Sequence, residues 1–201
     1  MQLITSPLSP FVRKVRVLIR EAGKQAEVEE RPVSTTVFEP DPQALSANPT
    51  GKIPALIRDD GPTVFDSRVI CRYLDAKWQV GLYPESRIWE VLTLEALADA
   101  VTEAALAVAY ERRFRDEDKR SAPWMEGQWR KVAGGLDALE DRWMSHLTGP
   151  LTMAQIAVGC ALGYVDLRLP EKNWRVGRAQ LAAWEAKLAD RPAMQETKPV
   201  V

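Results

Sequence analysis

Serine, aspartate and lysine side chains near the N-terminus stand where they could hold a small charged ligand. Ser9 and the pair Asp66-Ser67 each precede a stretch with helical spacing, and Lys52 precedes the pair Ile53-Pro54 at the start of an expected strand. A helix N-terminus presents unpaired backbone N–H groups and the positive end of the helix dipole, which favours a bound anion. A serine hydroxyl can donate a hydrogen bond there, and lysine or aspartate can pair with an opposite charge.

Each of these positions also has an ordinary structural explanation. Serine and aspartate are preferred N-cap residues in any helix, so Ser9 and Asp66 could serve only as caps. Only about one X-Pro bond in twenty is cis, which favours an ordinary trans Pro54 at a strand edge. Lys52 could be a solvated surface charge. The order of the surrounding elements has to decide between the two interpretations.

The elements of the N-terminal part alternate between strand and helix. Residues 2–5 form a short apolar strand, and Pro10 opens a helix whose apolar positions repeat at helical spacing as far as Gly23. Because that helix provides the crossover, a second strand at residues 28–33 should pair in parallel with the first. Beyond it we expect at most one short helix in 40–50, a strand at 52–57, a short hairpin arm at 63–65 and a helix from Ser67.

Strand signals nearly vanish after residue 84, and helical spacing takes their place. The predicted helices span residues 86–115, 122–147, 152–169 and 178–189. The third is apolar on all sides, which is typical of a buried central helix. The shift in composition near residue 80 predicts a small α/β domain at residues 1–78 and an all-helical domain at residues 86–201.

Two features of the helical part have mainly structural interpretations. Thr152 and Gln155 have the spacing of a capping box, in which both side chains bind backbone groups at a helix N-terminus, and we assign them to folding. Arg112, Arg113 and Arg115 lie in a run of mixed charge that is typical of a solvated segment between helices. A contact with an anionic substrate is the alternative for these arginines.

The joint order of these features resembles the glutathione S-transferase superfamily over essentially the whole chain. The likeness rests on Ser9-Pro10 opening a helix, on the run Asn48 to Leu56 leading into a strand, and on Phe65 to Ser67 opening the next helix. The runs Ser9 to Lys14 and Phe65 to Ser67 are most similar to small bacterial members of the YibF type. The resemblance implies a thioredoxin-like N-terminal domain followed by an all-helical C-terminal domain.

The resemblance also implies a binding site for glutathione, which would be a co-substrate. In this family the proline that matches Pro54 is cis, and the residue before it, here Ile53, offers its backbone N–H and C=O to the cysteinyl part of glutathione. The γ-glutamyl carboxylate would meet the helix N-terminus at Asp66 and Ser67, and its ammonium would meet Asp66. Lys52 could pair with a ligand carboxylate. Many relatives have Glu in place of Asp66, so the ammonium contact has a different reach here.

Ser9 is the candidate catalytic residue, because its hydroxyl would donate a hydrogen bond to the glutathione sulfur and favour the thiolate. Lowering a thiol pKa by two units takes about 2.7 kcal/mol. One charge-assisted hydrogen bond, about 1.5 to 3 kcal/mol, and a helix dipole, up to about 1 kcal/mol, supply that amount. Ser6 is the rival, since some relatives use a serine nearer the strand end. We favour Ser9 because Pro10 places it at the helix cap.

The function that the resemblance implies is a glutathione transferase, with detoxification as its role and glutathione peroxidase as a related activity. The thiolate would be conjugated to, or would reduce, a small hydrophobic electrophile. Ser9 cannot form a mixed disulfide, which disfavours a thioltransferase. The alternative is a non-catalytic protein of the same fold that binds a protein partner. The wall for the electrophile is expected at Leu8, Phe11, Leu106, Tyr110 and Phe114.

Composition narrows the partners further. Over 201 residues, 27 Lys and Arg nearly balance 28 Asp and Glu, and the net charge of -1 favours neither nucleic acid nor an anionic membrane. We find no apolar run near the roughly 18 residues of a membrane span and no signal-peptide pattern, and therefore expect a cytoplasmic protein. Cys71 and Cys160 fit buried core thiols, and His146, the single histidine, gives no support for a metal site. The family resemblance implies a homodimer.

Overall fold

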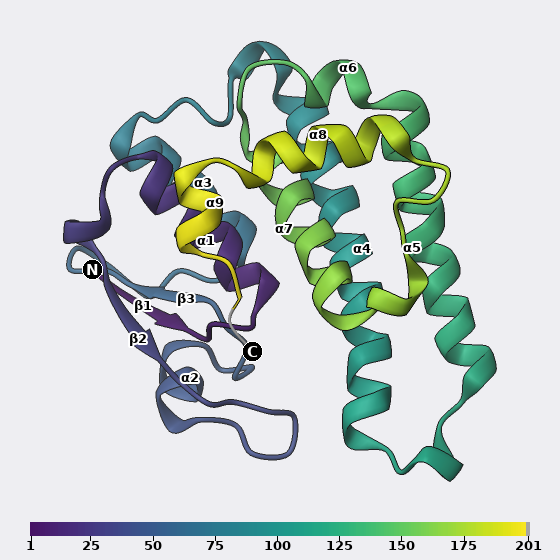
Figure 1. Ribbon diagram of the computed structural model, residues 1–201. Coiled ribbons are helices and arrows are strands. Elements are labelled where there is room, and N and C mark those ends of the chain that lie inside the picture. The colour runs from purple at the N-terminus through teal and green to yellow at the C-terminus, as the bar shows by residue number, and fades with distance from the viewer. Residues whose placement is uncertain (200–201) are drawn as a thin grey trace. The chain divides into compact units, whose positions relative to one another are not determined.

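The computed structural model describes residues 1–199, which form two compact units (Figure 1). The first unit comprises Met1–Pro84 together with the residues from Arg191 onward, and the second comprises Glu85–Asp190. The first unit contains a small sheet, whereas helices make up the ordered elements described in the second.

A three-stranded sheet with the order β2-β1-β3 forms the centre of the first unit. The central strand β1 (Gln2–Thr5) pairs in parallel with β2 (Glu29–Pro32) and antiparallel with β3 (Ala55–Ile57). The parallel pairing confirms the predicted crossover, which helix α1 (Pro10–Glu21) provides. The predicted hairpin arm is reduced to a single bridge between Leu56 and Val64.

Helices α1 and α3 (Ser67–Trp78) pack against each other in the first unit. Proline occupies the first position of α1, and Ser9 is its N-cap, as the sequence predicted. The apolar spacing of α1 buries Val12, Val15 and Leu18 completely. The first unit also contains a 3-10 turn at Gln25–Glu27 and the short helix α2 (Pro42–Ala47).

The last described residues return to the first unit, which corrects their expected place in a helical domain at 86–201. Helix α9 (Pro192–Glu196) packs against α1 (Figure 1). The buried Arg13 donates a hydrogen bond of 3.0 Å to the carbonyl of Met194, and Arg191 binds Glu21 through two hydrogen bonds of 2.8 and 2.6 Å. These contacts join residues more than 160 positions apart, which explains why local sequence pattern missed them.

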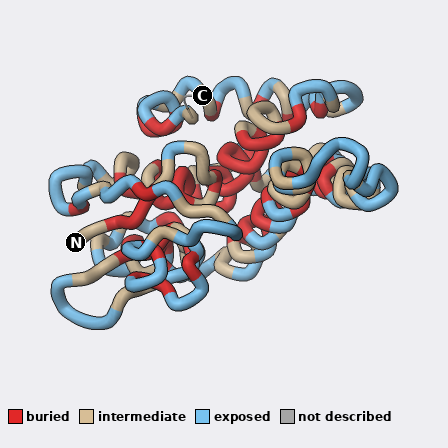
Figure 2. Tube along the Cα trace, turned by 90° about the horizontal axis from the view of Figure 1, so that it is seen from below, coloured by how far each residue is buried: buried red, intermediate tan, exposed pale blue. Residues whose placement is uncertain are grey.

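The second unit is built around helix α7 (Met153–Arg168), which packs against α4 (Ile88–Phe114) and α8 (Ala179–Ala189). Of the 16 residues of α7, 12 are buried, as predicted for a central helix, and they belong to the buried class drawn red in Figure 2.

The predicted helix at 122–147 is interrupted at Trp143, whose ψ of 0° lies outside the α-helical range. Two helices result, α5 (Ala122–Arg142) and α6 (Met144–Leu147). Short 3-10 turns occupy Glu85–Arg87, Glu117–Lys119 and Pro170–Lys172.

Both cysteines are buried and form no disulfide within residues 1–199, in line with the expected core thiols. Across residues 1–199, helices that combine enough length with enough apolar character to cross a membrane are absent. The same residues contain no cluster of three or more histidine, cysteine or acidic side chains that could hold a metal ion.

Candidate functional site

Strand register brings the three candidate segments of the first unit to one end of its sheet. Ile4 pairs with Ala55 in the antiparallel ladder, so the chain leaves β1 at the same end at which it enters β3. The bridge between Leu56 and Val64 is also antiparallel, so the chain beyond Val64 runs back to that end. Three segments therefore lie at the same end of the sheet: the loop with Ser9, the Ile53-Pro54 peptide, and the start of α3 at Asp66.

Ser9 caps helix α1 and keeps its hydroxyl proton available. Its Oγ accepts a hydrogen bond of 3.3 Å from the backbone N–H of Val12. Within residues 1–199, the hydroxyl proton of Ser9 has no acceptor. Accepting one bond and donating another are compatible for a hydroxyl, and the accepted bond polarises the O–H group. The capping role and the proposed catalytic role of Ser9 therefore do not exclude each other.

Ser6 stays a rival for the thiol contact. Its carbonyl accepts a bond of 3.2 Å from the N–H of Ser9, and its half-buried side chain has no hydrogen-bond partner in the described chain. The difference between the two serines is their position, because only Ser9 lies at the positive end of the α1 dipole.

The Ile53-Pro54 peptide is cis, which confirms the expectation for Pro54. In the described part of the chain, neither the N–H nor the C=O of Ile53 has an intramolecular hydrogen-bond partner. Its side chain packs on a buried cluster of Ile4, Val33, Ala44, Ala47 and Ala55. The backbone groups of Ile53 are thus open to a ligand while its side chain is anchored in the core.

Asp66 and Ser67 begin helix α3. The Asp66 carboxylate accepts a bond of 2.8 Å from the N–H of Arg68, and its side chain remains 57% exposed. The Arg68 Nε lies 3.6 Å from the same carboxylate oxygen. Ser67 is buried, with its hydroxyl 3.5 Å from that oxygen. A carboxylate has about four lone-pair sites, so the cap leaves Asp66 able to accept from a ligand ammonium.

The Phe65-Asp66 peptide is also cis, although no proline is involved, and the sequence did not predict this. Lys52 has an exposed side chain with no ion-pair partner in residues 1–199. Its carbonyl accepts a bond of 3.0 Å from the Asn48 amide, which holds the chain just before Ile53. The Lys52 ammonium is therefore available to a ligand carboxylate.

The five residues expected to form the electrophile wall lie in both units. Leu8 and Phe11 are half-buried in the first unit. Leu106, Tyr110 and Phe114 recur every fourth residue of α4 and therefore share one face of that helix. The rings of Tyr110 and Phe114 meet edge to face with centroids 5.2 Å apart. The wall as a whole stays a prediction.

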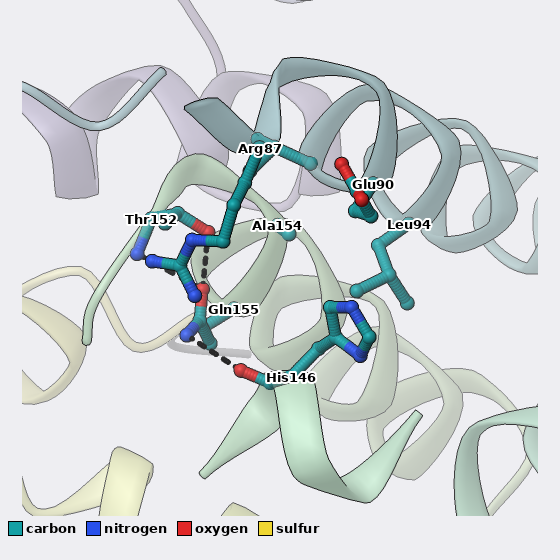
Figure 3. Close-up of a pocket in the computed structure, with 8 residues that line it drawn as sticks. Arg87, Glu90, Leu94, His146, Thr152, Ala154 and Gln155 are labelled. Carbon is teal, nitrogen blue, oxygen red and sulfur yellow. Dashed lines mark hydrogen bonds between the residues drawn. The ribbon is translucent and has the colours of Figure 1, made fainter. Parts of the chain in front are cut away.

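A small pocket in the second unit surrounds the predicted capping box, which the structure confirms (Figure 3). The Gln155 Oε1 accepts a bond of 2.9 Å from the N–H of Thr152, whose hydroxyl also donates to it. The Gln155 amide donates to the carbonyls of Pro150, at 2.8 Å, and His146, at 3.2 Å. These polar groups are satisfied by one another, so we assign the pocket to folding.

A larger pocket of about 290 Å³ lies against α4 and α7, in the second unit. The sequence indicated Arg113 as a possible ligand contact but not Tyr164 or Arg168, which also line this pocket. The available signal was their spacing: a tyrosine and an arginine four residues apart share one face of an otherwise apolar helix. Burial raises the pKa of Tyr164, and the nearby Arg168 opposes this only in part.

Known proteins are similar to this chain over its full length. Residues 8–77 match the family model of the glutathione S-transferase N-terminal domain, and residues 122–187 match that of the C-terminal domain. The chain is 31% identical to the uncharacterized GST-like protein YibF of Escherichia coli (strain K12), over 99% of this chain and 98% of that protein.

Two solved structures of a glutathione transferase family member from Pseudomonas fluorescens Pf-5 are also similar. One, with bound glutathione, is 41% identical with a TM-score of 0.96 and covers 100% of this chain and 99% of its own. The other, with bound S-(propanoic acid)-glutathione, is 40% identical with a TM-score of 0.91 and covers 100% of both chains. The likeness confirms the predicted thioredoxin-like domain followed by an all-helical domain.

Proposed function

Because the chain belongs to the glutathione S-transferase family, we propose that its first unit binds glutathione and activates the thiol. The glutathione thiolate then forms a bond to a small hydrophobic electrophile, or reduces such a molecule. The observation that carries the proposal is the meeting of Ser9, Ile53 and Asp66 at one end of the sheet, each with a group left open to a ligand.

These open groups match the chemistry of glutathione part by part. The backbone N–H and C=O of Ile53 suit the amide groups of the cysteinyl residue, which hydrogen-bond as a strand does. The γ-glutamyl end carries an ammonium, which suits the exposed Asp66 carboxylate, and a carboxylate, which suits the N–H groups at the start of α3. Lys52 would pair with the carboxylate at the other end of the tripeptide.

Ser9 lowers the pKa of the bound thiol in this proposal. The thiol proton leaves to solvent, and the Ser9 hydroxyl donates a hydrogen bond to the resulting thiolate at the N-terminus of α1. The thiolate then attacks the electrophilic carbon: the C–S bond forms, and a leaving group departs with its bonding electrons. A pKa near 6.5 instead of about 8.5 raises the thiolate fraction at pH 7 from roughly 3% to roughly 75%.

The related structures support glutathione as the ligand. The Pseudomonas fluorescens family member binds glutathione in one structure and S-(propanoic acid)-glutathione, a sulfur-substituted form, in the other. We propose the same sulfur as the reacting atom in this chain.

Calorimetry and a thiolate titration test the proposal. We expect glutathione to bind at millimolar concentration or below. Ser9→Ala should retain binding but raise the pKa of the bound thiol by about one to two units, because one hydrogen bond to a charged group is lost. Ser6→Ala is the matched control and should leave that pKa unchanged. The thiolate ultraviolet absorbance of the complex, followed against pH, gives the pKa.

If calorimetry shows no glutathione binding at millimolar concentration, the proposal is refuted. A pKa that responds to Ser6→Ala and not to Ser9→Ala would instead move the catalytic role to Ser6. Turnover with aryl halides and with peroxides then separates conjugation from reduction, and binding without any turnover would favour the non-catalytic alternative.

A further inference from the structure

Asn48 is a buried polar residue at the end of helix α2, four positions before Lys52. Its side chain and backbone together are only 4% exposed, and its backbone N–H donates a hydrogen bond of 2.8 Å to the carbonyl of Ala44 in α2. Burying an amide side chain costs free energy unless its polar atoms find partners. The partners of the Asn48 amide therefore show what its burial secures.

The Asn48 side chain makes three hydrogen bonds, of which two shape a turn. Its Oδ1 accepts from the N–H of Thr50, at 3.1 Å, and from the Thr50 hydroxyl, at 2.9 Å. Bonds of this kind, from an asparagine to the residue two positions later, are typical of turns. The third bond reaches beyond the turn: Nδ2 donates to the carbonyl of Lys52 at 3.0 Å. Formation of the turn accounts for the first two bonds but not for the third.

The third bond fixes the orientation of the peptide group that joins Lys52 and Ile53. That group is trans, because the cis bonds of the described chain are those before Pro54 and Asp66. In a planar trans peptide the C=O and the N–H point in nearly opposite directions. By holding the Lys52 carbonyl, the Asn48 amide therefore sets the direction of the Ile53 N–H. A carbonyl that accepts a hydrogen bond also makes the N–H of the same peptide a better donor.

The same peptide group is held from its other side by the side chain of Ile53. That side chain packs on the buried cluster to which Ala44 and Ala47 of α2 belong. The Ile53 N–H itself has no hydrogen-bond partner within residues 1–199. An open donor that is held in this way loses little conformational freedom when a ligand binds, so it is preorganised for an acceptor.

We propose that Asn48 is a positioning residue of the glutathione site. Its side-chain amide holds the Lys52 carbonyl and thereby aims the Ile53 N–H at the cysteinyl carbonyl of glutathione. This inference rests on the proposed function, to which it adds a residue that acts through Ile53. The competing explanation is that Asn48 only stabilises the turn.

The first experiment measures glutathione binding by calorimetry in two Asn48 variants. Asn48→Asp keeps the shape of the side chain and the acceptor for Thr50 but cannot donate to the Lys52 carbonyl. Asn48→Leu removes the donor without adding a charge. Both should weaken glutathione binding about 3- to 10-fold, the worth of one hydrogen bond. Thr50→Val is the matched control, because it removes the hydroxyl bond and leaves the Asn48–Lys52 bond, and it should change the affinity by less than about twofold.

Nuclear magnetic resonance of the Ile53 amide proton distinguishes positioning from stabilisation of the turn. In the unmodified protein and in Thr50→Val, saturating glutathione should move this proton downfield, because a hydrogen bond deshields it. In both Asn48 variants the downfield shift should be smaller. Unchanged signals elsewhere in the spectrum show that a variant is folded, and Asn48→Asp, which keeps the bonds from Thr50, gives the test by itself if Asn48→Leu does not fold.

The second experiment removes the acceptor instead of the donor. The probe is a glutathione isostere in which a trans alkene replaces the amide between cysteine and glycine, so that the cysteinyl carbonyl is absent. The unmodified protein should bind this isostere more weakly than glutathione. If Asn48 acts through the Ile53 N–H, neither Asn48 variant should weaken binding of the isostere further by more than about twofold, because coupled changes are not additive.

The outcomes separate this inference from the proposed function. If the unmodified protein does not bind glutathione, both are rejected. If glutathione binds equally well to the Asn48 variants, the role of Asn48 is overturned and the proposed function stands. The same holds if the Asn48 variants lose equal affinity for glutathione and for the isostere, or if the downfield shift of the Ile53 proton is unchanged in them.

Discussion

Replacing Gln155 by Glu tests why an amide begins the buried helix α7. An acidic side chain in a first helical turn gains about 0.3 to 1 kcal/mol from the helix dipole, so Gln155→Glu should stabilise the protein if only the dipole mattered. Gln155, however, is only 3% exposed. Its amide donates to the carbonyl of Pro150 and to that of His146, the second of which Figure 3 shows. A carboxylate cannot donate either bond.

The cost of Gln155→Glu can be worked from these contacts. The Pro150 carbonyl loses its hydrogen-bond partner within residues 1–199, which costs about 1 to 3 kcal/mol for an unsatisfied group. The His146 carbonyl still accepts from Gly149, at 3.2 Å, so losing its second bond costs about 1 kcal/mol. After the dipole gain is subtracted, we expect Gln155→Glu to lower the free energy of unfolding by about 1 to 4 kcal/mol at pH 7.

The effect of Gln155→Glu should depend on pH in a defined direction. Burial and the two facing carbonyl oxygens favour the protonated form, which can donate, so the pKa of the introduced carboxyl is raised in the folded state. The destabilisation should therefore be smallest below the unfolded pKa of about 4.3, grow as the pH rises toward the folded pKa, and stay constant above it.

Urea unfolding between pH 4 and pH 8 measures this dependence against the unmodified protein. Gln43→Glu is the matched control, because Gln43 is an exposed glutamine in the first turn of α2, and the change there should stay within about 0.5 kcal/mol. If Gln155→Glu were as stable as the unmodified protein at pH 7, the two amide donors would not explain the glutamine.

Two further predictions concern packing in each unit. Trp174 is 1% exposed, and its indole N–H donates a hydrogen bond of 2.8 Å to Asp166. Trp174→Ala should therefore lower the free energy of unfolding in urea by about 3 to 5 kcal/mol. Trp89 is 76% exposed, so the control Trp89→Ala should lower it by less than about 0.5 kcal/mol. Met194 anchors α9 and is 3% exposed, so Met194→Ala should cost about 2 to 5 kcal/mol, with the exposed Lys198→Ala as its control. Equal effects of a buried residue and its exposed control would contradict either prediction.

Sequence predicted the helix starts of the candidate site because their signals are local. Ser9 before Pro10, and Asp66 before the apolar spacing of α3, specify N-caps within four residues of chain. The parallel pairing of β1 and β2 was also predictable, because a helical crossover allows little else. The cis Ile53-Pro54 peptide came from the family resemblance and not from the local pattern, whose base rate favours trans.

The interruption at Trp143 and the return of the chain to the first unit could not be predicted in the same way. Residues 122–147 keep one helical pattern through Trp143, so periodicity alone shows no break there. Helix α9 has only five residues, and its position is fixed by Arg13 and Glu21, nearly the whole chain away. Short helices have weak local signals, and long-range ion pairs have none.

The arginines at the end of α4 show where a charge count along the sequence loses information. Arg112, Arg113 and Arg115 are equivalent in a run of mixed charge, but they differ in the fold. Arg115 pairs with Glu111 one turn away, which spacing could predict, and Arg112 pairs with Glu171, which spacing could not. Arg113 makes no ion pair with any residue in 1–199, and it lines the same pocket as Arg168 of α7. A net charge of -1 is therefore compatible with a local excess of positive charge, because the balancing acids lie elsewhere in the structure.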